Sequence, residues 1–266
     1  MKNKFKNFPV LIKTLPFVIS VIFLKMFVFD LFSFNGVHIN SLIEISDIGI
    51  IFTGAFFVVG LMLASTMTDF KESEKIPGEI ACNLEAIENS ILLAFRSSED
   101  KVSSINKDHV RLELIEITES IILWINSKDK DSYIIFKNLS RLNEMAFSFS
   151  EKNFDKDVVK VIQENTNALR KQITRTYTIS KNDLLAPSKT LLKGIISVIF
   201  VLVLLAKFKT IAANYFVTFT ISFLFMYLYF LIIGLDDPFN SSGDTEVDLK
   251  PIDRFLIRLK EGFLIS

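Results

Sequence analysis

The sequence lacks the residue patterns on which most enzymes and nucleic-acid-binding proteins depend. A single cysteine, Cys82, excludes an internal disulfide framework, and the two histidines, His38 and His109, lie in separate segments. There is no glycine-rich phosphate loop and no nucleophile elbow. Basic and acidic residues number 30 each, so no excess of positive charge favours nucleic acid. We therefore predict no enzyme and no required cofactor, and we expect Cys82 to be a small buried residue on a helix.

What the chain does contain is four long apolar segments. They run over Thr14–Phe34, Ile48–Met67, Thr190–Ala206 and Ile211–Gly234. A membrane-spanning helix needs about 20 predominantly apolar residues. Apolar residues make up 50% of the chain and charged residues 23%, too apolar for a soluble domain and too charged for a pure membrane bundle. We predict an all-α integral membrane protein with four transmembrane helices and a cytosolic helical bundle.

The distribution of basic residues predicts the orientation. Lys2, Lys4, Lys6 and Lys13 precede or begin the first span, and basic residues near a span favour the cytoplasmic side. No small-residue cleavage site follows that span, so we expect it to be retained. The loop 35–47 contains no Lys or Arg and fits the outside. The prediction is a multi-pass protein of the cell membrane with both termini in the cytoplasm.

The spans divide the chain into four parts. We expect a first transmembrane pair in residues 1–68, a cytosolic helical domain in 69–189, a second pair in 190–235 and a cytosolic C-terminal segment in 236–266. Pro77-Gly78 is expected to break the chain after the second span. Apolar residues then recur every three to four positions, which predicts helices near Glu79–Phe95, Asp108–Asn126, Ser132–Phe149 and Phe154–Ile179. Phe147 is placed on the apolar face of the third. Pro251–Leu264 is a further amphipathic piece, for the membrane surface or for the helical domain.

The second span has a regular stripe that we call the neck stripe: Thr53, Phe57, Leu61 and Ser65. These residues are four apart, so they lie along one face of a helix. Two interpretations remain open. The large side chains pack against lipid or protein, or they line a central pore whose apolar constriction gates by dewetting.

Charged residues next to the spans are the other candidates for a functional site. Asp69, Glu72 and Glu74 follow the neck stripe without a matching basic cluster, which predicts an inner mouth that prefers cations or selects poorly. Lys25 and Asp30 interrupt the first span; we expect them to pair between subunits, to lie near the outer surface, or to act in conduction.

Two acidic segments follow the fourth span. In Asp236-Asp237-Pro238-Phe239, Pro238 ends the helix, Phe239 is expected to be a buried anchor, and the acids need donors, for which Arg170, Lys171 and Arg175 are candidates. Asp244, Glu246 and Asp248 alternate in a loop. They offer oxygens to calcium, although an ordinary acidic turn is favoured.

Two stretches resemble the bestrophin family in its bacterial branch. Phe52–Lys75 resembles the family's second span, and Phe219–Asp248 resembles its fourth span followed by a Leu-acidic-acidic-Pro-Phe motif and an acidic loop. The resemblance implies a homopentamer in membrane lipid with an axial path for small ions, and it assigns the neck to Thr53, Phe57 and Leu61. The chain departs from the family in having Asp69-Phe70 after the neck and few acids in the calcium loop.

The leading hypothesis is thus a homopentameric ion channel with a hydrophobic neck on the second span. One alternative is a membrane-anchored signalling or scaffold protein that conducts nothing. Another is a small transporter that uses Lys25 and Asp30.

Overall fold

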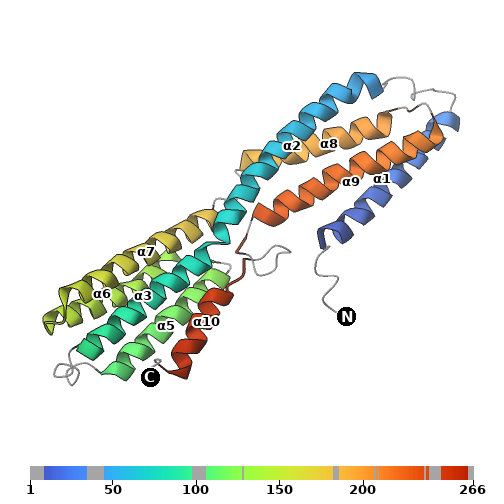
Figure 1. Cartoon of the computed structure of the whole chain (residues 1–266). Coiled ribbons are helices and arrows are strands. Elements are labelled where there is room, and N and C mark those ends of the chain that lie inside the picture. The colour runs from blue at the N-terminus through green and yellow to red at the C-terminus, as the bar shows by residue number, and fades with distance from the viewer. Residues whose placement is uncertain are drawn as a thin grey trace. The chain divides into compact units, whose positions relative to one another are not determined.

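The computed structural model describes residues 9–34, 45–97, 106–127, 129–181, 186–206, 208, 210–236, 238–239 and 247–262 (Figure 1). Every regular element within these residues is an α-helix, which confirms the all-α prediction. The helices are α1 (Pro9–Phe34), α2 (Ile45–Ser73), α3 (Ile76–Ser97), α5 (Lys107–Asn126), α6 (Ser132–Glu151), α7 (Lys156–Lys181), α8 (Ala186–Leu205), α9 (Ile211–Asp236) and α10 (Lys250–Glu261).

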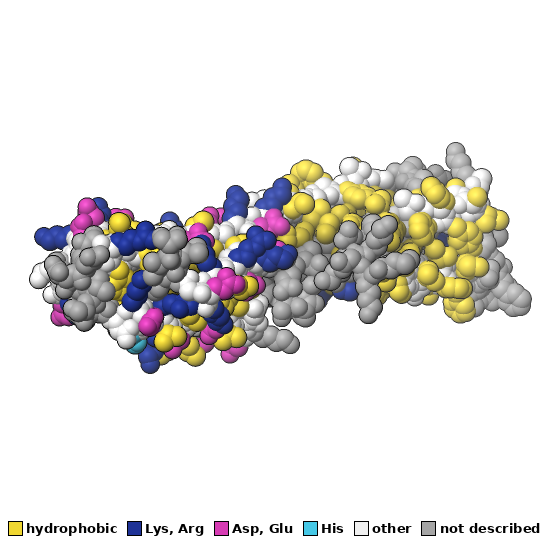
Figure 2. Space-filling view, turned by 60° about the horizontal axis from the view of Figure 1, so that its bottom comes forward, with side chains coloured by type: hydrophobic (Ala, Val, Ile, Leu, Met, Phe, Trp, Pro, Cys, Tyr) yellow, Lys and Arg dark blue, Asp and Glu magenta, His cyan; other side chains and the backbone are white. Residues whose placement is uncertain are grey.

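The helices form two compact units. We call α1, α2, α8 and α9 the membrane unit, and α3, α5, α6, α7 and α10 the helical domain. The boundary falls inside α2, after Phe70. Apolar side chains dominate the visible face of the membrane unit, whereas charges of both signs are spread over the helical domain (Figure 2). Helix α8, which contains the third apolar segment, starts at Ala186.

The membrane unit contains the four predicted spans, since α1, α2, α8 and α9 are each long and apolar enough to cross a bilayer. Helix α9 packs on both α1 and α8, and α1 also contacts α8. The buried core is made by α2, α8 and α9, through Ile48, Phe52, Ala55, Val59, Leu192, Ile196, Ile199, Val203, Phe225 and Ile232. All of these are aliphatic or aromatic, so the three helices pack by shape and dispersion contacts.

The five helices of the helical domain pack against one another. Helix α7 packs on α3 and α6, α5 packs on α6, and α10 packs on α3 and α5. The predicted apolar faces supply the core, with Leu84, Leu114, Leu139 and Leu169 all fully buried. Two assignments were wrong. Phe147 is 63% exposed, because the buried positions of α6 continue through Ala146 and Phe149. Cys82 is exposed on α3, since its neighbours Ile80, Ala81 and Leu84 occupy the core.

The ends of the helices follow from local sequence. The Asn106 side chain accepts hydrogen bonds from the backbone N–H groups of Asp108 and His109, at 2.9 and 3.2 Å, and so caps the start of α5. The expected break at Pro77-Gly78 lies earlier. Helix α2 runs to Ser73 and α3 starts at Ile76, with Pro77 in its first turn, where the missing N–H costs nothing.

Helix α10 was predicted to lie on the membrane surface or on the helical domain, and it packs on α3 and α5 of the helical domain. Its apolar residues Ile252, Phe255 and Leu259 are buried. The Arg258 guanidinium donates to Glu85 at 3.0 Å and to Glu88 at 2.6 Å. The Glu88 side chain is only 4% exposed, so Arg258 supplies the positive charge that this buried carboxylate requires.

We expect Arg258→Met to lower the free energy of unfolding of the protein by about 3 kcal/mol, because Glu88 then stays buried without its cation. Lys160→Met is the matched control, since Lys160 and Glu164 form an exposed pair on α7 at 3.8 Å. An exposed pair contributes about 1 kcal/mol at most. Denaturation in mild detergent, followed by circular dichroism, measures both; equal losses would show that the Arg258 pair is not special.

Candidate functional site

The neck stripe lies on the side of α2 that faces away from the core of the membrane unit. All four of its residues are exposed in the single chain, with Phe57 at 67% and Leu61 at 57%. Phe52, Ala55 and Val59, on the other side of the helix, are buried. Phe57 and Leu61 therefore form an apolar surface that the chain itself leaves uncovered.

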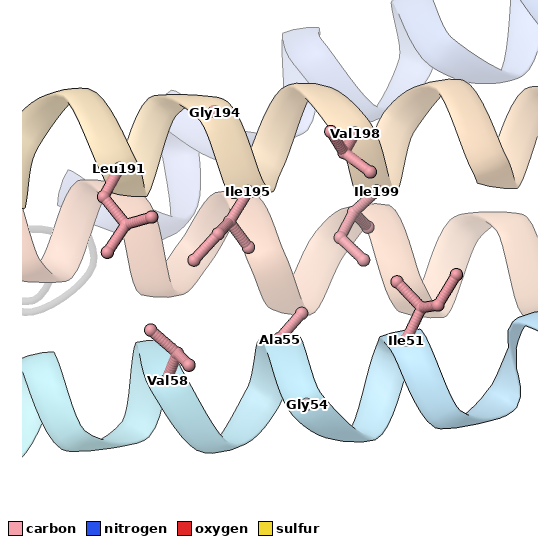
Figure 3. Close-up of a pocket in the computed structure, with 9 residues that line it drawn as sticks. All are labelled: Ile51, Gly54, Ala55, Val58, Leu191, Gly194, Ile195, Val198 and Ile199. Carbon is pink, nitrogen blue, oxygen red and sulfur yellow. The ribbon is translucent and has the colours of Figure 1, made fainter.

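Next to the neck stripe, α2 and α8 enclose an apolar groove of about 420 Å³ (Figure 3). It is lined by Ile51, Gly54, Ala55, Val58, Leu191, Gly194, Ile195, Val198 and Ile199. Gly54 and Gly194 have open space where a Cβ atom would stand. Around α2, at about 100° per residue, the core face, the groove and the neck stripe follow one another.

The sequence showed no basic cluster to match the acidic residues after the neck stripe, but one of these residues has a basic partner in the structure. The Glu72 carboxylate forms an ion pair with the Arg175 guanidinium of α7. Asp69 and Glu74 are exposed. The charge of Glu72 is thus countered by a residue about a hundred positions later in the chain, which sequence spacing gives no means of finding.

The post-span motif begins with a buried ion pair. The Asp236 carboxylate is 8% exposed and lies 2.8 Å from the Lys189 ammonium in the first turn of α8. Two of the three expected donors have other partners: Arg170 donates to the Ser140 hydroxyl, and Arg175 contacts Glu72. Lys171 is exposed. The pairing of Lys189 with Asp236 could have been predicted from position, because the start of α8 and the end of α9 meet when two consecutive spans form a hairpin.

The remainder of the motif is apolar. Phe239 is 4% exposed, and the Pro238 carbonyl accepts a hydrogen bond from the Val247 N–H at 3.0 Å. Asp237 lies outside the described residues. Phe239 thus has the burial expected of an anchor for the chain that leaves α9.

The candidate calcium ligands are represented by one residue, because Asp244 and Glu246 lie outside the described residues. The Asp248 carboxylate accepts hydrogen bonds from the Lys250 side chain at 2.9 Å and from its backbone N–H at 3.0 Å. These bonds, the side-chain bond first, lower the pKa of Asp248. In the described part of the chain, no three His, Cys, Asp or Glu side chains gather as metal ligands.

Lys25 makes contacts within its own chain that the sequence did not predict. It is 3% exposed inside its own chain, and its ammonium donates to the carbonyls of Val203 at 2.6 Å and Ala206 at 3.2 Å. The ring of Phe208 lies 4.9 Å away. Lys25 therefore binds the carbonyls at the C-terminal end of α8, where a positive charge is favoured. The side chain of Asp30 lies outside the described residues.

Comparison with known proteins identifies the architecture. No family model matches the sequence, and no curated protein matches it either. Among solved structures, two single-residue variants of a bacterial bestrophin homologue from Klebsiella pneumoniae superpose with TM-scores of 0.76 and identities of 11% and 12%. They cover 94% and 93% of this chain, which covers 98% and 99% of theirs. Another structure of this homologue gives a TM-score of 0.74 at 12% identity, with 92% of this chain and 98% of that one covered.

Four apolar spans and a helical domain make the chain a membrane protein. The match over most of its length gives it a bestrophin-like fold.

We expect Lys189→Met to destabilise the protein by about 3 kcal/mol, since it leaves the Asp236 carboxylate buried without its cation. Lys193→Met is the matched control, because Lys193 lies one turn further along α8 and is exposed. Thermal unfolding in lipid nanodiscs compares the variants. If Lys189→Met and Lys193→Met have the same melting temperature, the ion pair does not hold α8 to α9.

Proposed function

We propose that this chain is a subunit of a homopentameric ion channel of the cell membrane, with a hydrophobic neck formed by the neck stripe of α2. The observation that carries the proposal is the exposure of Phe57 and Leu61 on a helix whose other side is buried. The bestrophin-like fold supports it, as this family forms pentamers around an axial ion path. Closed cyclic symmetry brings the same face of each chain to a common axis.

The position of the apolar groove supports the same assembly. In a ring of chains whose neck stripes face the axis, the groove beside the stripe turns towards a neighbouring chain. Gly54 and Gly194 leave room there for close approach of an apolar helix. We therefore assign the groove to contact between subunits and the more distant apolar faces of α1, α8 and α9 to membrane lipid.

The neck would act as a barrier because rings of Phe57 and Leu61 side chains exclude water from a narrow passage. Thr53 and Ser65 bound this apolar stretch with hydroxyl groups. The basic residues at the start of the chain support a cytoplasmic position for both termini. Lys25 is assigned to structure rather than to transport, because its ammonium already binds the carbonyls of α8.

We expect Phe57→Ala combined with Leu61→Ala to raise basal current in planar bilayers by roughly tenfold, the effect of removing about 1.4 kcal/mol from a barrier. The matched control combines Phe216→Ala with Val201→Ala, which truncates one exposed aromatic and one exposed aliphatic residue on α9 and α8. Unchanged current in the neck variant, with the oligomer intact, would contradict the neck assignment. No current from any form of the protein would favour the scaffold alternative.

We expect weak ion selectivity with a modest cation preference. Glu72 is compensated by Arg175, which reduces the negative field of the inner mouth. Reversal potentials under a salt gradient measure the preference. Arg175→Gln uncovers one carboxylate per subunit and should shift the reversal potential further towards the cation value. A clear chloride preference of the unmodified protein would contradict this part of the proposal.

A further inference from the structure

Helix α9 carries a row of buried polar residues inside a segment that is otherwise apolar. Asn214, Thr218 and Ser222 are four apart, and they are 7%, 0% and 0% exposed. The Thr218 hydroxyl donates to the Asn214 backbone carbonyl at 2.6 Å. By contrast, Ser222 Oγ and Asn214 Oδ1 have no hydrogen-bond partner among the described residues.

The unpaired state of Ser222 Oγ is informative because a serine on a helix has an easy alternative. Its hydroxyl can bond back to the carbonyl four residues earlier, as Thr218 and Thr220 both do on this helix. Ser222 Oγ makes no such bond. Lipid offers such a group no partner, and a polar atom buried without one is costly.

Two independent contacts place Ser222 at the depth of Lys25. The rings of Phe17 on α1 and Phe230 on α9 lie 5.6 Å apart, and the two helices run in opposite directions (Figure 1). Eight residues along α1 lead from Phe17 to Lys25, and eight back along α9 lead from Phe230 to Ser222. The rise per residue is the same in both helices, so the two side chains are at about the same level.

The second contact gives the same level from α8. Lys189 and Asp236 are paired at 2.8 Å, and fourteen residues from each lead to Val203 and Ser222. Val203 is the residue whose carbonyl accepts the hydrogen bond from Lys25. The buried ammonium, this carbonyl and the unpaired hydroxyl therefore lie at one depth, on the three helices that pack together in the membrane unit.

Among the described residues, two backbone carbonyls accept hydrogen bonds from Lys25, and its third donor has no acceptor. An ammonium group carries three N–H donors. Two of them bind the carbonyls of Val203 and Ala206, and among the described residues its remaining contact is the face of the Phe208 ring. Buried water characteristically bridges polar groups that protein atoms leave unsatisfied.

We propose that a buried water molecule bridges the third N–H of Lys25 to Ser222 Oγ, between α1, α8 and α9 of a single chain. The water accepts from the ammonium and donates to the hydroxyl oxygen. It thereby supplies hydration to a charge that lies within a membrane span.

The test compares Ser222→Ala with Thr218→Val in lipid nanodiscs. Thr218 is the matched control because its hydroxyl is satisfied within the helix, and removing it leaves no other group unpaired. We expect Ser222→Ala to lower the melting temperature by about 3 °C, the shift that corresponds to loss of one hydrogen bond. Thr218→Val should change it by less than about 1 °C.

A second arm isolates the bridge itself. In a Lys25→Met background, Ser222→Ala should cost less than in the unmodified protein, because the water has already lost its donor. A high-resolution map should show density between the two side chains that is absent in Ser222→Ala. If Ser222→Ala is neutral or stabilising, the hydroxyl holds no water and the proposal is overturned.

Melting temperatures measured with and without chloride distinguish water from a small anion at this site. Replacing chloride by gluconate should leave the melting temperature of the unmodified protein unchanged. A chloride-dependent rise in melting temperature that Ser222→Ala abolishes would show an anion at the site and would overturn the assignment to water.

Discussion

A bilayer offers no hydrogen bonds, so every polar group within the spans of this protein needs a partner inside the protein. The membrane unit provides partners for its buried charges through a few long-range contacts. Lys25 of α1 binds the last carbonyls of α8, and Lys189 at the start of α8 neutralises Asp236 at the end of α9. These two contacts join opposite ends of α8 to its neighbours, so the positions of three helices depend on them.

Helix α2 packs on α8 and α9 with one side only, and its opposite side is exposed in the single chain. Phe52 and Val59 are buried on its inner side against α8 and α9, and the ring centroids of Phe56 and Phe225 lie 4.5 Å apart. Phe57 and Leu61 remain on the outside. A helix that is held firmly on one side and presents a regular apolar stripe on the other is suited to line a narrow passage. The proposed neck follows from this division of α2 between core and surface.

The sequence predicted the features that depend on local periodicity. The four spans and the helices of the helical domain follow from runs of apolar residues and from spacings of three to four, and α10 was found by the same signal. Errors arose where the face of a helix shifts by one position, as with Phe147 and Cys82. Burial of a side chain depends on the neighbouring helix as well as on its own.

Pairings between distant charges were outside the reach of sequence alone. Lys189 with Asp236, Arg175 with Glu72 and Arg258 with Glu88 join residues that only the fold brings together. The row of polar residues on α9 had a visible spacing of four, but its two unpaired atoms could be recognised only from the packed helices. The neck stripe, in contrast, was found from its spacing, and its role remains a prediction.

A cryo-electron microscopy structure of the protein in lipid nanodiscs tests the proposed pentamer and its neck directly. We expect a particle with five-fold symmetry in which α2 surrounds the axis and the Phe57 and Leu61 side chains form its narrowest point. A monomer or dimer, or an oligomer in which the neck stripe faces lipid, would contradict it.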